Sequence, residues 1–151
     1  MPSLSLNTPV GRLTLDETDE AIVGVRWCED AQSNGSPLLL EAARQLSAYL
    51  DGKLTAFDLP LGAAGSQFEQ AVWAAMCAIP YGQTRSYGDV AHELDSGPRA
   101  VGRACGRNPI PIIVPCHRIL GRSGMGGYSG GTGLPTKQWL LGLEGVLLRA
   151  A

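Results

Sequence analysis

Residues 98–118 read PRAVGRACGRNPIPIIVPCHR, and the character of the sequence changes twice along this segment. Pro98 suits the first turn of a helix, where the missing amide hydrogen costs nothing. Three arginines then recur every fourth residue: Arg99, Arg103 and Arg107. On a helix this spacing places their guanidinium groups on one face. Pro109 and Pro111 cannot continue the helix, because proline lacks the amide donor and clashes with the preceding turn. We therefore predict a helix that ends near Asn108.

The apolar residues that follow, Pro111–Pro115, predict a buried extended segment that delivers Cys116, His117 and Arg118 at its end. Cysteine attacks carbon only as a thiolate, so a reactive cysteine needs a nearby base. Neighbouring side chains in an extended segment point to opposite sides. We therefore expect a water molecule, rather than a direct contact, to bridge Cys116 and His117. A Cys-His pair by itself is more typical of a buried structural cysteine.

An imidazole that acts as a base needs an acceptor on its other nitrogen. The remaining acidic residues of the C-terminal half are interpreted as cap, surface or turn residues, which leaves Glu144 by elimination. Arg118 has two open interpretations, a DNA contact or a buried brace for the turn. Cys77 and Cys105 are interpreted as small apolar side chains.

A second helix is predicted just before the arginine-bearing one, from about Tyr87 to Leu94, with a turn at residues 95–97. Two short helices joined by a glycine-containing turn are typical of a helix-turn-helix, although similar corners occur in proteins that never bind DNA. Upstream, residues 66–69 read SQFE, a capping box that predicts a helix through about Ile79.

The N-terminal part alternates in the manner of a β-meander, with a hairpin predicted from residues 11–15 and 21–27. Ser36 and Pro37 predict the start of a helix that stops at Gly52, and Leu54–Leu59 predicts a further short strand. The predicted fold class is α+β. We predict a small α/β support domain at residues 1–60, a linker at 61–65 and a mostly helical C-terminal domain at 66–151.

Charge is divided unevenly between these parts. Residues 1–60 carry four basic and nine acidic side chains, whereas residues 61–151 carry eight basic and five acidic ones. The basic part is the candidate for a polyanionic partner, although a charged face is often only solvated. No apolar run approaches the roughly 20 residues that span a bilayer, and no signal peptide is recognisable. Four scattered cysteines without a C-x-x-C pair argue against a metal site.

Several ordered motifs together resemble the O6-alkylguanine-DNA alkyltransferases. They are residues 115–119 (PCHRI), Asn108-Pro109, residues 99–102 (RAVG), Ser86-Tyr87, residues 127–131 (GYSGG) and residues 139–145 (WLLGLEG). The resemblance is strong over residues 66–145. It implies a ribonuclease-H-like N-terminal domain and a C-terminal domain, residues 66–151, that binds DNA and accepts the alkyl group. Ile119 departs from the family, which usually has valine at this position.

The resemblance also implies roles for individual residues. Cys116 is the expected alkyl acceptor, His117 its base, Glu144 the group that orients His117, and Tyr87 the proton donor to guanine. Arg99 is expected to fill the gap that the flipped nucleotide leaves. The expected DNA-contacting set is Arg99, Ala100, Gly102, Arg103 and Arg107. The expected pocket and bracing set is Asn108, Val114, Pro115, Ile119, Tyr128 and Ser129.

The implied function is direct, single-turnover DNA repair that moves the methyl or larger alkyl group of O6-alkylguanine to Cys116, with O4-alkylthymine left open as a second substrate. We expect double-stranded DNA containing the lesion as partner. We expect a monomer, with cooperative packing on DNA left open, in the cytoplasm in association with the nucleoid. No cofactor, metal or membrane is expected. The alternatives are a non-catalytic lesion-binding protein that recruits other repair, a Cys-His hydrolase, and a plain helix-turn-helix regulator. The first lacks an acceptor cysteine, and nothing outside Cys116 and His117 indicates the second.

Overall fold

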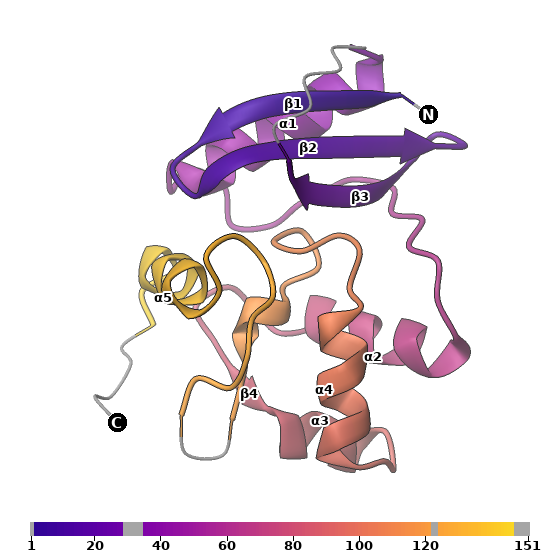
Figure 1. The fold of residues 1–151 in the computed structure, drawn as a ribbon, viewed down its shortest axis with the longest axis vertical. Helices are drawn as coiled ribbons and strands as arrows, with labels where there is room; N and C mark the ends of the chain where they lie inside the picture. Colours follow the sequence, from indigo (N-terminus) through magenta and orange to yellow (C-terminus); the bar gives the residue numbers. More distant parts are fainter. Residues whose placement is uncertain (1, 29–34, 122–123, 147–151) are drawn as a thin grey trace. The chain divides into compact units, whose positions relative to one another are not determined.

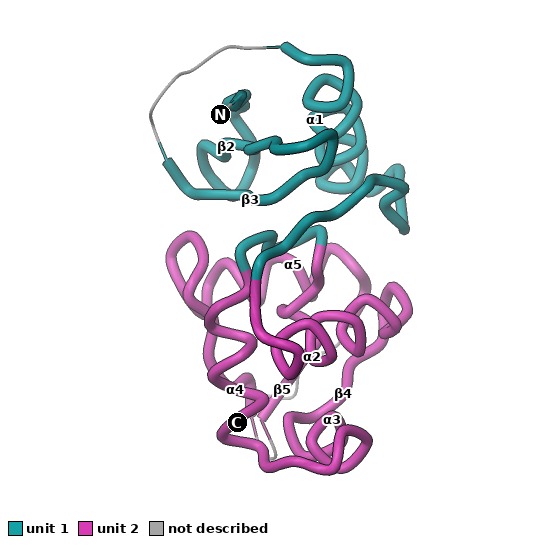
Figure 2. Tube along the Cα trace, turned by 90° about the vertical axis from the view of Figure 1, so that its right-hand side faces the viewer, with its two compact units in different colours: residues 1–64, 109–113 teal, residues 65–108, 114–151 magenta. Residues whose placement is uncertain are grey.

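The chain divides into two compact units, which Figure 2 shows in different colours. The computed structural model describes residues 2–28, 35–121 and 124–146. Unit 1 comprises residues 1–64 together with 109–113, and unit 2 comprises residues 65–108 and 114–151. The segment that follows the arginine-bearing helix therefore belongs to unit 1, although its sequence neighbours on both sides belong to unit 2. All the side chains of the predicted catalytic set belong to unit 2.

Unit 1 is built on an antiparallel sheet of β1 (Ser3–Thr8), β2 (Gly11–Thr18) and β3 (Ala21–Trp27), in that order (Figure 1). The predicted hairpin is confirmed as β2 and β3, and β1 adds a strand to it. The turn between β2 and β3 places Asp19 and Glu20 at positive φ, as tight hairpin turns require. Helix α1 (Pro37–Leu50) packs against all three strands and buries Leu39 and Leu46.

The sequence predicts the start of α1 correctly, but the strand predicted directly after this helix is absent. Ser36 accepts a hydrogen bond from the Leu39 amide at 3.1 Å, which confirms the predicted start of the helix. The strand predicted at Leu54–Leu59 is wrong. The amide of Asp58 donates to Gln45 Oε1 at 2.8 Å, and Gln45 Nε2 donates to the Asp58 carbonyl at 3.1 Å. A side chain of α1 therefore occupies backbone groups that a sheet ladder would use.

Unit 2 contains the predicted helix pair. Its elements are α2 (Gln67–Cys77), β4 (Arg85–Ser86), α3 (Tyr87–Glu93), α4 (Pro98–Gly106), the 3₁₀ turn η1 (Cys116–Arg118), β5 (Ile119–Leu120) and α5 (Leu134–Leu143). The capping box at Ser66 and Glu69 is confirmed at the start of α2. Helix α4 packs against both α2 and α3, and Trp73 Nε1 donates to the Ala104 carbonyl at 2.9 Å. The α3–α4 pair has the connectivity of a helix-turn-helix.

The extended segment predicted at Pro111–Pro115 is wrong in shape and right in burial. Ile112 adopts a φ of 73°, so the chain turns at this residue instead of running straight. Ile110, Ile112, Ile113 and Val114 are all buried. An extended strand alternates its side chains between two faces, whereas a turn can bury consecutive residues on one side. Cys116 therefore enters the site from a turn and begins η1.

Candidate active site

Cys116 is held at the start of η1 by a short set of hydrogen bonds. Its amide donates to the Val114 carbonyl at 2.8 Å, and the Arg118 amide donates to the Pro115 carbonyl at 3.0 Å. Asn108, at the end of α4, donates through Nδ2 to the same Val114 carbonyl at 2.9 Å. The Asn108 side chain also hydrogen-bonds to the Cys116 thiol. Asn108 thus connects the arginine-bearing helix to the turn that carries the sulfur.

His117 and Glu144 form a buried pair. The distance between His117 Nε2 and Glu144 Oε2 is 2.8 Å, and both side chains are fully buried. With a carboxylate as acceptor, the proton of this hydrogen bond sits on Nε2, and the lone pair of the neutral ring is then on Nδ1. This is the arrangement that orients an imidazole for use as a base.

Arg118 braces the same carboxylate. Its Nε donates to Glu144 Oε1 at 2.9 Å, its second terminal nitrogen donates to Oε2 at 3.0 Å, and its first donates to the Ile79 carbonyl at 2.7 Å. The Gly82 amide also donates to Glu144 Oε1, at 3.2 Å. Arg118 is buried, so of the two open interpretations the structure supports the brace. The carboxylate is thereby compensated by a guanidinium and fixed in position.

Burial sets the protonation of Cys116 and of His117. It lowers the pKa of His117, although the hydrogen bond to Glu144 opposes this effect. The imidazole is therefore neutral near pH 7 and able to take a proton. Burial raises the pKa of the Cys116 thiol, and the Asn108 hydrogen bond and the charge of Lys137 oppose that shift. Cys116 is thus a protonated thiol at rest, and any reaction that used it as a nucleophile would need a base.

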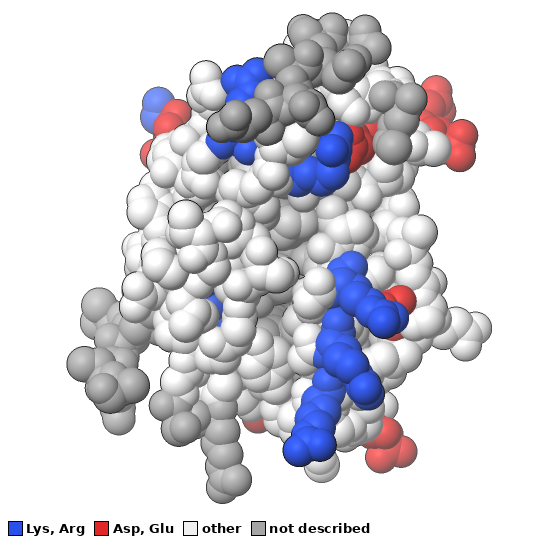
Figure 3. Space-filling view, in the orientation of Figure 1, with Lys and Arg blue, Asp and Glu red and all other residues white. Residues whose placement is uncertain are grey.

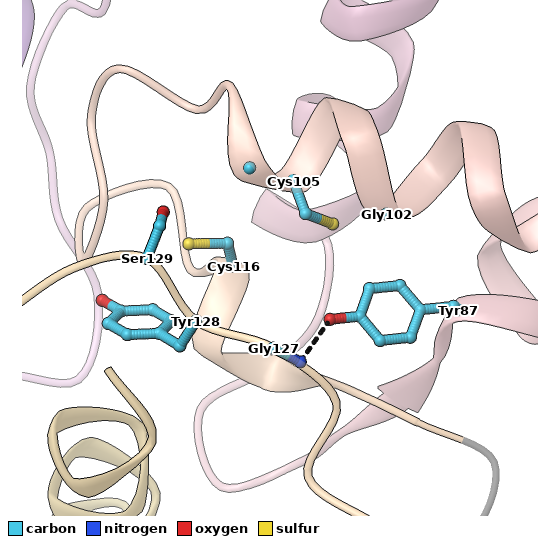
Figure 4. Close-up of a pocket in the computed structure, with 8 residues that line it drawn as sticks. Tyr87, Gly102, Cys105, Cys116, Gly127, Tyr128 and Ser129 are labelled. Atoms are coloured by element: carbon cyan, nitrogen blue, oxygen red, sulfur yellow. Dashed lines mark hydrogen bonds between the residues drawn. The ribbon is translucent and has the colours of Figure 1, made fainter.

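A cavity of about 280 Å³ lies beside the sulfur. Figure 4 shows the side chains that line it, with Cys116 between the loop that carries Tyr128 and Ser129 and the helix that carries Gly102 and Cys105. Tyr87, from the start of α3, reaches into the same cavity, and its hydroxyl accepts a hydrogen bond from the Gly127 amide at 3.4 Å. Burial raises the pKa of Tyr87, so its hydroxyl keeps its proton at neutral pH and can donate it.

Lys137 was not predicted as a site residue, yet it holds the pocket-side loop together. Its ammonium is fully buried and donates to the carbonyls of Ile119 at 2.6 Å, Met125 at 2.5 Å and Gly127 at 3.1 Å. It also lies 5.9 Å from the centre of the Tyr87 ring. Burial lowers the pKa of Lys137 to about 8. One cation therefore fixes the strand after η1, the glycine-rich loop and the position of Tyr87.

The arginine-bearing face of α4 is exposed. Figure 3 shows a row of basic side chains over this helix, and the three arginines of α4 and its C-cap, Arg99, Arg103 and Arg107, are all exposed. Arg99 lines a shallow depression together with Tyr87, Gly102 and Gly127, which also line the Cys116 cavity. Arg107 lies 3.5 Å from Glu69 on α2, so the negative charge of this carboxylate partly compensates the positive charge of Arg107.

The structure brings together some predicted residues and separates others. Cys116, Tyr87, Gly102, Tyr128 and Ser129 line one cavity. Ala100, Arg103 and Arg107 line a separate groove beside α2. Val114, Pro115 and Ile119 are buried and do not line the cavity. Within the described ranges no three His, Cys, Asp or Glu side chains gather as metal ligands, and no helix is long and apolar enough to cross a membrane.

Comparisons with known proteins match both parts of the chain. The model of the 6-O-methylguanine DNA methyltransferase ribonuclease-like domain matches residues 4–63, and the model of the DNA binding domain of the same family matches residues 67–146. The methylated-DNA–protein-cysteine methyltransferase of Mycolicibacterium paratuberculosis is 42% identical, over 93% of this chain and 90% of its own length. The protein of the same name from Methanosarcina acetivorans is 40% identical, over 91% of this chain and 94% of its own length.

Solved structures agree with these matches. A crystal structure of Mycobacterium tuberculosis OGT in complex with DNA is 42% identical to this chain with a TM-score of 0.84, and the match covers 94% of this chain and 91% of that one. An O6-methylguanine DNA methyltransferase from Methanococcus jannaschii is 25% identical with a TM-score of 0.71, and that match covers 98% and 96% of the two chains.

Proposed function

The chain belongs to the 6-O-methylguanine DNA methyltransferase family, and on that premise we propose that it moves the alkyl group of O6-alkylguanine in DNA onto the sulfur of Cys116. The chain is a methylated-DNA–protein-cysteine methyltransferase, which repairs DNA by alkyl transfer to one of its own cysteines. Of the four cysteines, Cys116 is the one that both lines the cavity and precedes the buried His117–Glu144 pair. That juxtaposition is the observation that carries the assignment.

The proposed reaction is an in-line displacement at the alkyl carbon. The Cys116 thiol gives its proton, through a bridging water, to neutral His117, and the imidazolium that forms is stabilised by Glu144. The sulfur forms a bond to the alkyl carbon while the bond from that carbon to guanine O6 breaks, and the electron pair stays with guanine. Tyr87 donates its phenolic proton to the guanine ring, because an anionic guanine is a poor leaving group.

The product is a thioether at Cys116, and nothing in the site regenerates the thiol. Each chain therefore acts once. The same reasoning disfavours a Cys-His hydrolase, whose covalent intermediate must break down for turnover. A lesion-binding protein without chemistry is also disfavoured, because Cys116 lines the cavity beside a base that is positioned to activate it.

DNA reaches this site by way of α4. The alkyl carbon is buried in the base stack of a duplex, so the nucleotide must rotate out before a thiol can attack it. Arg99 lies beside the depression that adjoins the cavity, and we assign it to the gap left in the duplex. Ala100 has a small side chain and Gly102 has none, which permits close approach of the helix to the minor groove. Arg103 and Arg107 are assigned to phosphates, which gives affinity with little sequence preference.

The remaining assignments concern the setting of the reaction. The partner is double-stranded DNA that carries O6-alkylguanine, and one chain is sufficient for one lesion, because every proposed catalytic side chain comes from unit 2 of the same chain. Since DNA is the substrate, we place the protein in the cytoplasm in association with the nucleoid.

A titration tests single-turnover repair. Increasing amounts of the full chain are added to a fixed amount of duplex DNA that contains O6-methylguanine, and the remaining lesion is counted after the reaction ends. The proposal predicts that one lesion disappears per active chain and that longer incubation removes no more. Repair that continues beyond one lesion per chain would show that the thiol is regenerated and would refute the single-use reaction.

A further inference from the structure

Two cysteines line the cavity in which the alkyl group is transferred. Cys116 enters it from η1, and Cys105 enters it from α4. Both are free thiols, and both are partly exposed. The transfer reaction uses the thiol of Cys116, and the prediction that Cys105 is only a small apolar side chain does not account for its place in the pocket. The cavity therefore contains a second nucleophilic sulfur without a role in the repair reaction.

The two thiols face one cavity, and the charge state of one affects the other. Burial raises the pKa of Cys105 to about 12, and a negative charge on Cys116 adds to that shift. The interaction between charges falls with distance, so this coupling agrees with the place of both cysteines on the lining of one cavity. Figure 4 shows the two sulfurs directed to different sides of the cavity. A rotation about the Cα–Cβ bond between staggered positions redirects either one.

The pocket has open space along the side of α4 that lines it. A Cβ atom added at Gly102 or at Gly106, which both line the cavity, would meet nothing within 4 Å. The cavity volume of about 280 Å³ also exceeds the roughly 30 Å³ that one water molecule occupies. The cavity can therefore hold a group larger than a water molecule beside the two cysteines that line it.

We propose that Cys105 and Cys116 together form a dithiol site for trivalent arsenicals, and that a bound arsenical excludes the alkyl group from the pocket. An arsonous acid, R–As(OH)₂, condenses with two thiols to give R–As(S–Cys)₂ and two molecules of water. Two arsenic–oxygen bonds break, two arsenic–sulfur bonds form, and each thiol proton leaves in a water molecule. Arsenic remains trivalent, so the step needs no oxidant or reductant.

Other fates of the pair are less well supported by the site. A disulfide would need an oxidant and thiolate character, and burial raises the pKa of both thiols. A metal ion would need further ligands, and the described residues contain no cluster of three. A trivalent arsenical with one organic substituent needs the two sulfurs alone.

Two attachment points in one pocket make the adduct resistant to competing thiols. Once one arsenic–sulfur bond has formed, the second thiol acts at a high effective concentration, which typically raises the overall affinity by about 10²–10⁴-fold. An excess of a monothiol such as glutathione should therefore fail to remove the arsenical from the chain. A dithiol competitor should remove it.

Intact-mass measurement on the full chain tests the site directly. The probe is phenylarsonous acid, added in equimolar amount without DNA and followed by excess glutathione and desalting. The unmodified chain should retain one phenylarsenic group with the loss of two water molecules.

Cys105→Ala and Cys105→Ser should each retain at least about 100-fold less at the same glutathione concentration. Cys77→Ala, which removes an exposed cysteine of the same unit outside the cavity, should behave like the unmodified chain. Equal retention by the Cys105 variants, or loss of the adduct from Cys77→Ala, would overturn the proposal.

The effect on repair is measured separately, because it rests on the proposed function. Each variant is treated in the same way and then given DNA with O6-methylguanine, and the transfer is expressed relative to the untreated sample of that variant. The unmodified chain should lose most of its transfer, and the Cys105 variants should lose little. Full transfer by a chain that retains the arsenical would refute exclusion from the pocket. Failure of transfer in the untreated unmodified chain would count against the proposed function and would leave the mass result standing.

Discussion

Glu144 is the single side chain on which the geometry of the site depends most. It accepts hydrogen bonds from Arg118 and from the Gly82 amide, and it pairs with His117. A buried carboxylate with these partners keeps both the imidazole and the guanidinium in place. In the proposed reaction Glu144 acts through His117, and in the fold it stabilises Arg118.

Glu144→Gln should lower the rate of alkyl transfer by about 100-fold or more, because the imidazolium formed during attack loses its counter-charge. The melting temperature should also fall, because Arg118 keeps a buried charge without its partner. Single-turnover kinetics and thermal unfolding measure the two effects. Glu93→Gln makes the same chemical change at an exposed ion pair with Arg85 and should change neither quantity appreciably. A Glu144→Gln variant that transfers at the unmodified rate would contradict the role given to the pair.

The charge of Lys137 leads us to expect that the transfer rate depends on pH. Its pKa is lowered to about 8, so the ammonium is charged below that pH and neutral above it. Loss of the charge removes a donor to the loop carbonyls and an influence that lowers the pKa of Cys116. The transfer rate of the unmodified chain should therefore decline above about pH 8. Lys137→Arg stays charged, so its rate should not show this decline.

The comparison needs three controls, because arginine is larger than lysine and the site is buried. The melting temperature of Lys137→Arg reports whether the variant is folded at each pH, and Lys137→Met, which cannot be charged, should be slow at every pH. Lys53→Arg changes an exposed lysine of unit 1 and should keep the unmodified pH profile. The same alkaline decline in Lys137→Arg as in the unmodified chain would show that another group causes it.

These side chains differ in how far the sequence could predict them. Cys116 and His117 are adjacent, and a recognisable motif surrounds them. Glu144 could be reached only by elimination, because nothing in its neighbours indicates a buried carboxylate. Lys137 was missed because a lysine in a terminal helix normally lies in solvent. Its burial arises when three carbonyls from separate segments meet at one point, which local patterns do not reveal.

Among the elements, α4 is the one that the proposed function places between the DNA and the reacting sulfur. It carries Arg99 near the depression that adjoins the cavity. Its C-cap residue, Arg107, directly precedes Asn108, which braces the turn of Cys116. One helix thus presents its exposed face to the proposed duplex and its C-terminal end to the sulfur. A substitution on the exposed face should therefore affect reaction with DNA and spare reaction with a free base.

Arg99→Ala tests this separation. The variant should react with free O6-benzylguanine at nearly the unmodified rate and with duplex DNA at least about 10-fold more slowly, since extrusion of a base costs a few kcal/mol that the side chain no longer offsets. Single-turnover rates on the two substrates give the ratio. Arg44→Ala removes an exposed arginine of α1 in unit 1 and should leave both rates unchanged. Equal losses on both substrates for Arg99→Ala would argue against the gap-filling role.

The elements themselves were predictable where a local signal specifies them. The serine caps at Ser36 and Ser66 mark the starts of α1 and α2, and prolines mark the start of α4 and the residues after its end. The segment from Pro111 to Pro115 was predicted as extended because an unbroken apolar run has no periodicity. Its turn at Ile112 cannot be recognised locally, because a β-branched residue rarely adopts a positive φ.

For the chain as a whole, the division of charge matters more than its total. The net charge is −2, yet the C-terminal part is basic, and three exposed arginines lie together on α4 and its C-cap. Binding to DNA that neutralises phosphates releases counterions, so the affinity falls steeply with salt. The net charge alone would have argued against a nucleic acid as partner.

The salt dependence of binding tests which arginines contact phosphates. Binding of undamaged duplex is measured by fluorescence anisotropy at several salt concentrations, and the logarithm of the affinity is plotted against the logarithm of the salt concentration. Arg103→Ala should reduce the magnitude of the slope by about 0.9, the value expected for one lost phosphate contact. Lys53→Ala should not change the slope, because Lys53 lies in the acidic unit 1. An unchanged slope for Arg103→Ala would remove Arg103 from the interface.

The assignment of chain segments to units was the least predictable property of the whole molecule. Composition predicts a linker at residues 61–65, but it gives no sign that residues 109–113, which come soon after α4, group with unit 1. The Val25 amide donates to the Pro109 carbonyl at 2.9 Å, a contact between residues far apart in the sequence. Such pairing depends on tertiary structure, and no local pattern encodes it.

Peptide mapping after reaction with methylated DNA bears most directly on Cys116 as the alkyl acceptor. The full chain is incubated with duplex DNA that contains O6-methylguanine, its intact mass is measured, and the digested peptides are sequenced by mass spectrometry. The chain should gain one methyl group, located on Cys116, and Cys116→Ala should gain none, while Cys77→Ala should behave like the unmodified chain. A methyl group on another residue, or an equal gain in Cys116→Ala, would contradict the assignment of Cys116.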